Sequence, residues 1–231
     1  MSNPKVEIIA ANYNYTFQVY KSESVSHENL YMILKKDELS TDLEKMKPGF
    51  FKIEKYLGAI MAIFAYPLKE MIEVLREGVL SKLEVPVLET ARVLFVPGYI
   101  LFSGKSSPAK MALQILSPFV NISTSYLKAD PEKMREILEQ AAVIKSIQFR
   151  NIPHSEVDRI TLAGELEDVY NFGSLPLREA EITHFTGVYN TPLGIRNLKF
   201  SQNGRIQIAK SKKSAITLEL IDWVLKIFGG S

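Results

Sequence analysis

The residues of this chain best suited to chemistry are a group of basic side chains near its C-terminal end. No carboxylate occurs between Glu181 and Glu219, so the positive charges of this stretch have no acidic neighbour in the sequence. Lysine and arginine bind phosphate oxygens, and polar side chains among them contact sugars or base edges. The residues concerned are Arg196, Lys199, Arg205, Gln207, Lys210, Lys212 and Lys213. This pattern predicts a hairpin that binds nucleic acid.

The same charges have a second explanation that needs no ligand. Lysines on an exposed strand keep the edge of a sheet from pairing with another chain, and natural proteins use them in this way. The sequence therefore leaves two interpretations open for this segment, a phosphate-binding hairpin and a solvated, protected sheet edge.

The apolar residues of this hairpin predict how its strands pair. A two-residue turn at Asn203 and Gly204 would mix apolar and polar residues on each face. A three-residue loop, 202–204, with Gly204 in the left-handed conformation, separates them. In that register four apolar residues share one face, namely Leu198, Phe200, Ile206 and Ile208. The other face carries Asn197, Lys199, Ser201, Arg205 and Gln207.

A glycine-rich stretch, GYILFSGKS from Gly98 to Ser106, is similar to the phosphate-binding loop of nucleotide hydrolases. That loop has four residues between its first glycine and the Gly-Lys pair, all in irregular backbone, whereas this stretch has five, and Tyr99 to Phe102 are strand formers. We therefore expect a turn into a helix and no nucleotide cradle. The sequence still allows a weak anion site at Lys105 and Ser106, because free N–H groups at the start of a helix attract phosphate.

Other combinations of reactive residues do not form a recognisable site in the sequence. His27, His154 and His184 are far apart and show no metal-ligand spacing, and the acidic cluster of Glu165, Glu167 and Asp168 is typical of a solvated loop. The absence of cysteine excludes a disulfide framework, a thiol nucleophile and any cysteine zinc site. We predict no metal, no cofactor and no catalytic residue, with an enzyme assembled from distant residues as an alternative.

These residues must be positioned by a sheet with helices. Three stretches follow the order strand, glycine turn, strand and helix, namely Phe51 to Glu77, Arg92 to Leu116 and Arg196 to Phe228, turning at Gly58, Gly98 and Gly204. In the first of them Pro67 fits the first turn of a helix. That helix would carry Leu68, Met71, Ile72, Leu75 and Val79 on one side.

Further elements follow from periodicity and from turn residues. A starting hairpin is predicted from Val6 to Ala10 and from Tyr15 to Tyr20, a strand from Leu30 to Leu34, and a helix from Glu38 to Met46. A second helix starts at Asp130 and Pro131, and a third closes the chain. The remaining predicted strands are Val120 to Leu127, Ile144 to Ile152, Arg159 to Ala163 and Ile182 to Tyr189.

The expected fold is α+β, mostly antiparallel, with helices on one face of the sheet and recurring hairpin–helix units. A length of 231 residues with 46% hydrophobic content suffices for one large domain or two smaller ones. We place a boundary near residue 120, which gives halves of 1–120 and 121–231 that pack tightly or form a single domain.

The segment VLFVPGYILFSGKSSPAKMALQIL, residues 93–116, with residues 196–228 as a further unit, resembles a half-repeat of the TATA-binding protein family. The resemblance implies a saddle of two repeats whose concave sheet lies on the minor groove of DNA. The chain departs from that family in two respects. Its copies are unevenly spaced, and no residues of the sequence can be identified as the paired phenylalanines that wedge between base steps in that family.

Together these features predict a non-enzymatic, cytoplasmic protein that contacts nucleic acid through its basic C-terminal hairpin. The first twenty residues contain no secretory signal, and no apolar run is long enough to cross a membrane. The lack of cysteine also suggests a thermophilic source. A rival function is that of a protein-interaction module or homodimer, in which strands pair across a sheet edge.

Overall fold

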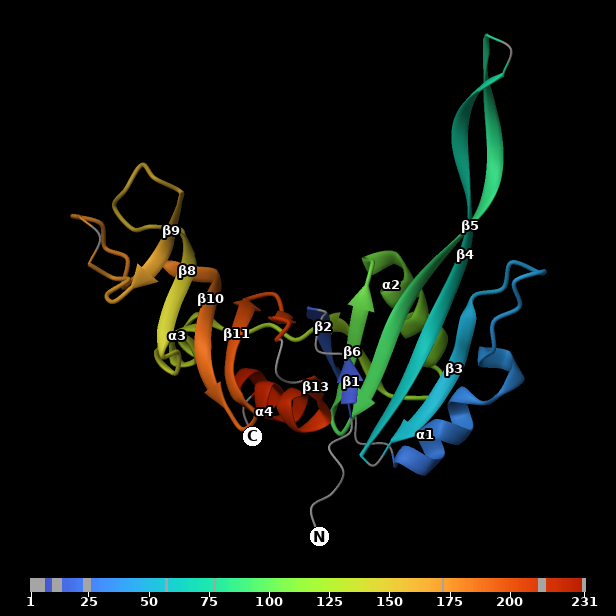
Figure 1. Ribbon diagram of the computed structural model, residues 1–231, viewed down its shortest axis with the longest axis horizontal. Helices are drawn as coiled ribbons and strands as arrows, with labels where there is room; N and C mark the ends of the chain where they lie inside the picture. Colours follow the sequence, from blue (N-terminus) through green and yellow to red (C-terminus); the bar gives the residue numbers. More distant parts are fainter. Residues whose placement is uncertain are drawn as a thin grey trace. The chain divides into compact units, whose positions relative to one another are not determined.

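The computed structural model describes residues 7–9, 14–22, 26–56, 58–76, 78–171, 173–211 and 215–229. The chain forms two compact units (Figure 1). Unit 1 comprises Met1–Val19 and Tyr126–Ser231, and unit 2 comprises Tyr20–Ser125. Each unit combines antiparallel strands with two α-helices among its described residues, so the predicted α+β class is correct.

Unit 2 is built on a four-stranded antiparallel sheet in which consecutive strands are neighbours, in the order β3-β4-β5-β6. Its elements are α1 (His27–Leu34), the 3-10 helix η1 (Asp37–Leu39), β3 (Gly49–Tyr56), β4 (Ala59–Arg76), β5 (Val79–Val96), β6 (Tyr99–Gly104) and α2 (Ser106–Leu116). The strand β7 (Ile122–Tyr126) follows at the end of this unit.

Both α-helices of unit 2 pack on the same face of this sheet. Leu34 of α1 and Leu113 and Leu116 of α2 are buried in one core with alternate residues of the strands. Within that core the rings of Phe50 and Phe64 meet edge to face, with centroids 5.0 Å apart. This core stabilises the sheet up to Ala65 and Ala91, where the neighbouring strands end.

Unit 1 contains a larger antiparallel sheet in the order β2-β12-β11-β10-β8-β9. Its strands are β2 (Tyr15–Ser22, of which residues 15–19 belong to this unit), β8 (Val143–Arg150), β9 (Arg159–Leu166), β10 (Glu181–Thr191), β11 (Gly194–Ser201) and β12 (Arg205–Ile208). A separate pair is formed by β1 (Glu7–Ile9) and β13 (Ile216–Thr217), and the helices are α3 (Pro131–Glu139) and α4 (Leu218–Gly229).

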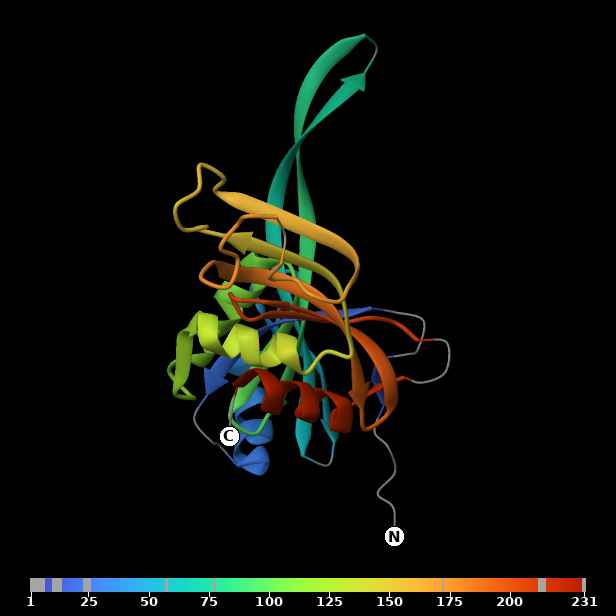
Figure 2. The same cartoon turned by 90° about the vertical axis from the view of Figure 1, so that its left-hand side faces the viewer.

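The helices α3 and α4 cover one face of the unit 1 sheet (Figure 2). The Tyr189 hydroxyl, on β10, donates a hydrogen bond of 2.8 Å to the carbonyl oxygen of Ile137 in α3. The ring of Phe200, on β11, stacks at 6.1 Å on that of Phe228 in α4. Because the helices cover only this face, outward-pointing residues of the central strands are left to form a surface.

Several predicted elements are confirmed. The helix α3 begins where its signals place it, since the Asp130 side chain accepts a hydrogen bond of 2.7 Å from the backbone N–H of Lys133 and Pro131 occupies the first turn. The predicted strands near residues 122, 144, 159 and 182 correspond to β7, β8, β9 and β10, and the closing helix corresponds to α4.

The helix predicted after Pro67 is wrong, because this segment is the second half of the long strand β4. Three of the five residues that suggested a helical face instead pair with apolar residues of β5, while Met71 pairs with Glu84 and Val79 lies in β5 itself. Leu68 pairs with Val87, Ile72 with Leu83 and Leu75 with Leu80. Cross-strand pairs of this kind are the unit of sheet stabilisation, and they outweigh a local helical pattern. The first of the three expected hairpin–helix units, residues 51–77, therefore contains no helix.

The N-terminal predictions also need correction. The segment β1 pairs with β13 and not with β2, so the expected starting hairpin is absent among the described residues. Residues 27–34 are helical because the Ser26 side chain caps them, accepting a hydrogen bond of 3.2 Å from the N–H of Asn29. The helix expected from Glu38 to Met46 is reduced to η1.

Among the residues that the structure describes, no helix combines the length and the apolar character needed to span a membrane.

Candidate functional site

The hairpin β11–β12 adopts the register predicted from its apolar residues. Leu198 pairs with Ile208, Lys199 with Gln207 and Phe200 with Ile206. Leu198, Phe200, Ile206 and Ile208 are each 0% exposed, on the side covered by the helices. Because side chains alternate along a strand, the polar residues point to the opposite, open face of the sheet.

The turn of this hairpin is enclosed by neighbouring backbone. The Gly204 N–H donates to the carbonyl of Ser201 at 2.9 Å, and the Gly204 carbonyl accepts from the N–H of Val19 at 3.1 Å. The adjacent Gln202 carbonyl accepts from Ala129 N–H at 2.9 Å. Gly204 has a φ of 76°, as the predicted three-residue loop requires. These contacts hold the outer residues of the hairpin in one position.

On its open face the sheet carries a polar hollow of about 470 Å³. Its lining comes from four strands and the hairpin turn, and consists of Thr16, His184, Lys199, Ser201, Asn203, Arg205 and Gln207. None of these lining residues is acidic. Three of them, Lys199, Arg205 and Gln207, belong to the hairpin predicted to bind nucleic acid.

Strand pairing brings the lining residues together from distant parts of the sequence. His184 of β10 pairs with Ser201 of β11, and Arg205 of β12 pairs with Gln18 of β2. Adjacent strands are about 4.8 Å apart, so His184 and Arg205, two strands apart, lie about 10 Å from each other at the backbone. This spacing distributes the imidazole and the guanidinium across one surface.

Two further arginines extend the positive charge toward the edge of the sheet. Arg150 of β8 pairs with Arg159 of β9, next to the pair formed by Gln148 and Thr161. We call the set His184, Lys199, Arg205, Arg150 and Arg159, with the polar residues of the hollow, the basic face. At its margin Glu181 pairs with Arg150 and accepts a hydrogen bond of 3.0 Å from the Asn151 side chain.

The pKa of the His184 imidazole is sensitive to the positive charge of the basic face. Its pKa is lowered, first because the ring is partly buried and then because Lys199, Arg150 and Arg159 are close enough to repel a further positive charge. His184 is therefore predominantly neutral at pH 7 in the absence of a ligand. An anion bound on this face would oppose that shift.

Arg196 lies on the other side of the sheet from the basic face. It is only 2% exposed, and its Nη2 donates a hydrogen bond of 3.1 Å to the carbonyl of Ala215. Burial lowers the pKa of its guanidinium. The prediction that Arg196 lies beside the phosphate-binding residues is therefore corrected, because its parity on β11 matches that of the buried Leu198 and Phe200.

The remaining basic residues of the predicted site are placed only in part. Lys210 is exposed after the end of β12, and its backbone N–H donates a hydrogen bond of 2.7 Å to the Asn14 side chain. Lys212 and Lys213 lie outside the described residues.

The glycine-rich stretch before α2 does not form a phosphate cradle. Residues 99–104 are the strand β6, and Ser106 begins α2. The ammonium group of Lys105 forms an ion pair with Glu89, and this hydrogen bond raises the pKa of Lys105. The weak anion site suggested for Lys105 and Ser106 thus has an acidic side chain beside its cation.

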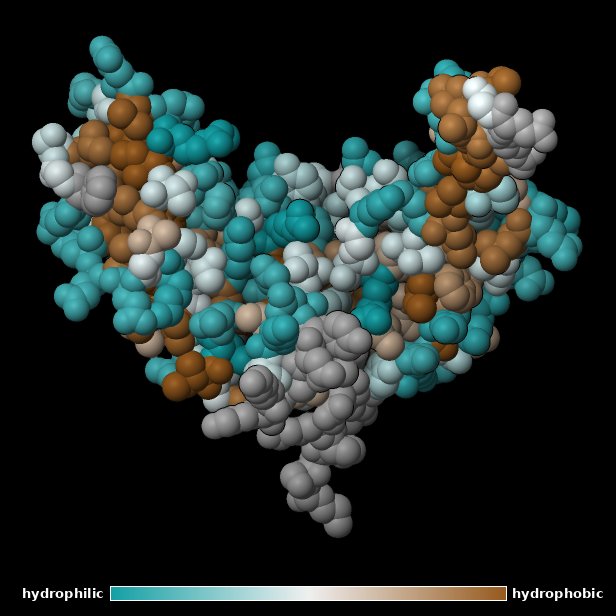
Figure 3. All heavy atoms as spheres, turned by 45° about the horizontal axis from the view of Figure 1, so that its top comes forward, coloured by the Kyte–Doolittle hydropathy of each residue, from teal (hydrophilic) through white to brown (hydrophobic). Residues whose placement is uncertain are grey.

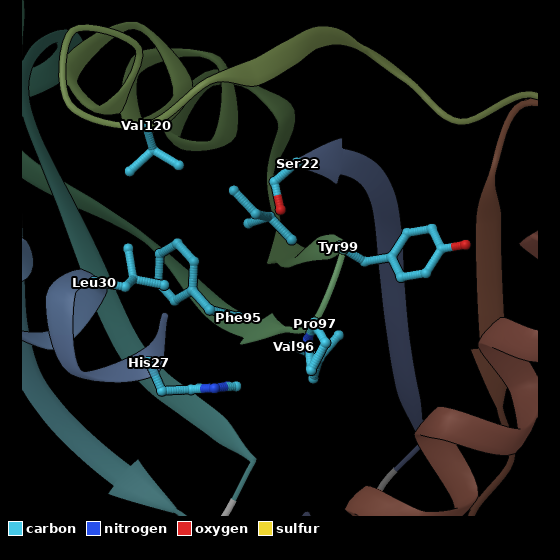
Figure 4. Close-up of a pocket in the computed structure, with 10 residues that line it drawn as sticks. Ser22, His27, Leu30, Phe95, Val96, Pro97, Tyr99 and Val120 are labelled. Carbon is cyan, nitrogen blue, oxygen red and sulfur yellow. The ribbon is translucent and has the colours of Figure 1, made fainter. Parts of the chain in front are cut away.

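A small pocket in unit 2 is too small for a substrate. Its volume of about 20 Å³ is close to that needed for a single water molecule. His27 is its only histidine, and Figure 4 shows the Tyr99 ring directed away from Leu30, Phe95 and Val120. Within the described part of the chain no three histidine or acidic side chains gather to hold a metal ion.

Sequence reasoning missed His184, Arg150, Arg159 and Thr16 as members of this surface. They come from strands that lie far from the basic hairpin in sequence, and only the order of the strands brings them together. Their alternation with buried residues was a usable signal, since Phe149 and Phe185 point to the core beside outward Arg150 and His184.

Comparison with known protein families and with curated proteins finds no match to this chain. The functional assignment therefore depends on the geometry of the basic face.

Proposed function

We propose that the protein binds nucleic acid through phosphate contacts on the basic face of unit 1. The observation that carries this proposal is the hollow lined by His184, Lys199 and Arg205 without an acidic side chain among its lining residues. Each cation that neutralises a phosphate releases condensed counterions, and this release supplies much of the affinity for nucleic acid. Hydroxyl and amide side chains beside the cations, such as Ser201 and Gln207, supply the hydrogen bonds that such contacts use.

Double-stranded nucleic acid fits this face better than single strands. Proteins that bind single strands stack bases on exposed aromatic rings. Among the described residues that line the hollow or extend it, His184 is the only one with an aromatic ring, and the others carry hydroxyl, amide or cationic groups. The phenylalanines and tyrosine of β10 and β11 point to the core. A surface of this kind contacts backbones and does not stack bases.

The resemblance of residues 93–116 and 196–228 to half-repeats of the TATA-binding protein family favours DNA as the first duplex to test. Binding by that family uses the face of a sheet against a minor groove. The absence of cysteine also fits a reducing, cytoplasmic setting, where nucleic acid is accessible.

The experiment replaces Lys199 and Arg205 of the basic face, together with the exposed Lys210 that follows β12, by glutamine and measures duplex DNA affinity by fluorescence anisotropy over a range of salt concentrations. Loss of three phosphate contacts should flatten the slope of log affinity against log salt by up to about 2.7. The variant should remain folded, because exposed charge changes shift stability by only about 0.5 kcal/mol.

A matched control removes the same charge from lysines of the same unit that are not members of the basic face. Lys133, Lys145 and Lys226 are each ion-paired with an acidic neighbour, Glu136, Glu165 and Asp222 respectively. Their triple replacement by glutamine should leave the salt slope close to that of the parent. Equal losses in both triple variants, or a parent that fails to bind at low salt, would overturn the proposal.

A further inference from the structure

The hairpin β4–β5 extends well past the body of unit 2 (Figures 1 and 2). The last pair between β3 and β4 joins Gly49 to Ala65, and the last pair between β5 and β6 joins Ala91 to Gly104. Beyond these points β4 and β5 pair only with each other, as far as Arg76 with Val79. We call residues 67–88 the arm.

The arm exposes large apolar side chains that a free hairpin does not need. Met71 is 62% exposed, Leu75 67%, Leu80 64% and Leu88 45%. Figure 3 shows hydrophobic residues gathered along this hairpin. A two-stranded hairpin alone is at best marginally stable in water, and three strands or a packed face are needed for independent stability. The arm is therefore a surface that gains stability when something covers it.

These four exposed residues lie on one face of the arm. Strand pairing and alternation place five cross-strand pairs on this face, which we call the leucine face. From the base of the arm outward they are Pro67 with Leu88, Lys69 with Pro86, Met71 with Glu84, Glu73 with Lys82, and Leu75 with Leu80. The intervening pairs, such as Ile72 with Leu83, belong to the opposite face.

The order of residues on the leucine face is self-complementary about its middle pair. Two positions from Met71 along β4 lie Lys69 on one side and Glu73 on the other, which have opposite charge. The pairs at both ends, Pro67 with Leu88 and Leu75 with Leu80, are apolar. Reversing the direction of the strand therefore superimposes apolar on apolar residues and lysine on glutamate.

We propose that the leucine face docks onto the same face of a second copy of this chain. The two arms run antiparallel about a two-fold axis at the pair formed by Met71 and Glu84. Such isologous contacts place the same surface of each copy against the other. Lys69 of each copy then faces Glu73 of the other, and the apolar pair at the base of one arm covers the apolar pair near the tip of the other.

The middle of this contact is compatible with the charges present. Glu84 meets its own counterpart near the axis, but the Lys69 ammonium of the same arm lies 3.4 Å from its carboxylate. Lys82 of the second copy faces Pro86, next to Glu84 along the strand. Each carboxylate at the axis thus has two lysines nearby, and the repulsion between the two glutamates is offset.

The size of the leucine face sets the strength of the dimer. Five alternate pairs extend over about 27 Å, and two strands are about 10 Å wide, so each copy offers about 270 Å². The total of about 540 Å² is below the roughly 1,200 Å² of a stable interface. The dimer is therefore reversible and concentration-dependent.

Charge reversal tests the geometry of the contact directly. Sedimentation velocity of the full chain between about 5 and 500 µM, a range suited to a weak interface, should show a rise in sedimentation coefficient with concentration. Lys69→Glu gives two arms that repel each other, and so does Glu73→Lys. Each variant alone should weaken dimerisation about tenfold or more. An equimolar mixture of the two should dimerise again, because the carboxylate introduced in one variant then faces the ammonium group introduced in the other.

A pair of double variants tests which face is used and controls for folding. Leu75→Thr with Leu80→Thr changes the leucine face and should abolish the rise in sedimentation coefficient. Ile72→Thr with Leu83→Thr makes the same chemical change on the opposite face, at residues 40% and 42% exposed, and should leave dimerisation unchanged. Threonine keeps the preference for strand in both variants.

A parent that sediments as a monomer at every concentration would overturn the proposal and leave the arm to a different protein. Loss of the dimer in the Ile72 and Leu83 variant alone, or failure of the charge-reversed mixture to associate, would overturn the antiparallel leucine-face contact. None of these three results bears on DNA binding, because the basic face belongs to unit 1 and its test uses the salt dependence of affinity.

Discussion

Two hairpins of this protein show opposite ways of using the same element. The hairpin β11–β12 is short, buries one face under helices and exposes cations on the other. The hairpin β4–β5 has 18 residues in each strand, and its outer half exposes apolar side chains. The first is stabilised within its own unit and leaves polar groups available to a ligand. The second leaves apolar surface available to a partner chain.

The turns of the two hairpins also differ in how closely other parts of the protein surround them. A Cβ atom added at Gly204 would lie 2.0 Å from the backbone oxygen of Leu127, whereas one added at Gly78 meets nothing within 4 Å. Both glycines have positive φ, 76° and 78°, so both carry the same conformational penalty when replaced. Only the turn of β11–β12 is also enclosed by the fold.

This difference predicts the largest effect of a single substitution. Gly204→Ala adds a backbone clash to the conformational penalty and should lower the free energy of unfolding by about 3 kcal/mol or more. Gly78→Ala carries only the conformational penalty and should cost about 1–2 kcal/mol. Urea denaturation followed by circular dichroism measures both. Equal costs in the two variants would show that the β11–β12 turn is not enclosed as described.

The contrast between the hairpins also explains which parts of the fold were predictable. Where β11 and β12 pair, Leu198, Phe200, Ile206 and Ile208 share one face and polar residues occupy the other, so a shift by one residue would exchange them, and the sequence specifies a single register. In the arm apolar residues occur on both faces, so alternation is weak. The spacing of Leu68, Met71 and Leu75 then matches a helix. The strand is favoured only because apolar residues of β5 pair with this segment, which the local sequence does not reveal.

The candidate site was predictable only where it is local. Lys199, Arg205 and Gln207 were identified because they share one short hairpin. His184 and Thr16 join them through pairing between strands that are distant in sequence, which periodicity alone does not specify. Arg196 was a local error, because the predicted register already placed even-numbered residues of this strand toward the core.

The second prediction tests the two faces of β11. Arg196→Ala removes a buried guanidinium that donates to the Ala215 carbonyl, and should lower the free energy of unfolding by about 2 kcal/mol. The same variant should leave the salt slope of DNA binding unchanged. Asn197→Ala, on the exposed face, should change stability by about 0.5 kcal/mol or less.

Thermal unfolding and anisotropy titrations on these two proteins separate the roles of the faces. If Arg196→Ala were as stable as the parent but reduced the salt slope, Arg196 would belong to the binding surface after all. The assignment of one face of β11 to the core and the other to ligand binding would then be wrong.

A smaller effect is expected from the protonation of His184. The pKa of its imidazole is lowered by burial and by the repulsion of Lys199, Arg150 and Arg159. A bound polyanion offsets that repulsion and favours the protonated ring, so DNA affinity should rise by up to about tenfold as pH falls from about 7.5 to 5.5. His184→Gln should flatten this dependence, whereas His154→Gln, at an exposed position of the same unit, should not.

The stability of the unliganded protein should change with pH in the opposite sense. A histidine whose pKa is lower in the folded state binds a proton more readily when unfolded. Stability is therefore fully retained above the unfolded pKa of about 6.5 and declines as pH falls toward the lowered folded pKa. Urea midpoints of the parent and of His184→Gln should converge at high pH and separate below it. A parent midpoint that rises on acidification relative to the variant contradicts the proposed charge environment.

The smallest effect is expected at Lys105, near the base of the arm. Its ammonium group is exposed and ion-paired with Glu89, whose side chain is only 11% exposed, so removing Lys105 leaves a partly buried carboxylate without its cation. The preceding residues 99–104 form the strand β6, so their N–H groups cannot curl around a phosphate. Lys105→Ala should therefore lower the urea midpoint only slightly, and should show the same absence of saturable ATP or GTP binding by calorimetry as the parent. Nucleotide binding by the parent that disappears in Lys105→Ala would assign a ligand to unit 2 and would contradict the proposed division of roles, in which β11–β12 binds a ligand and β4–β5 binds a second chain.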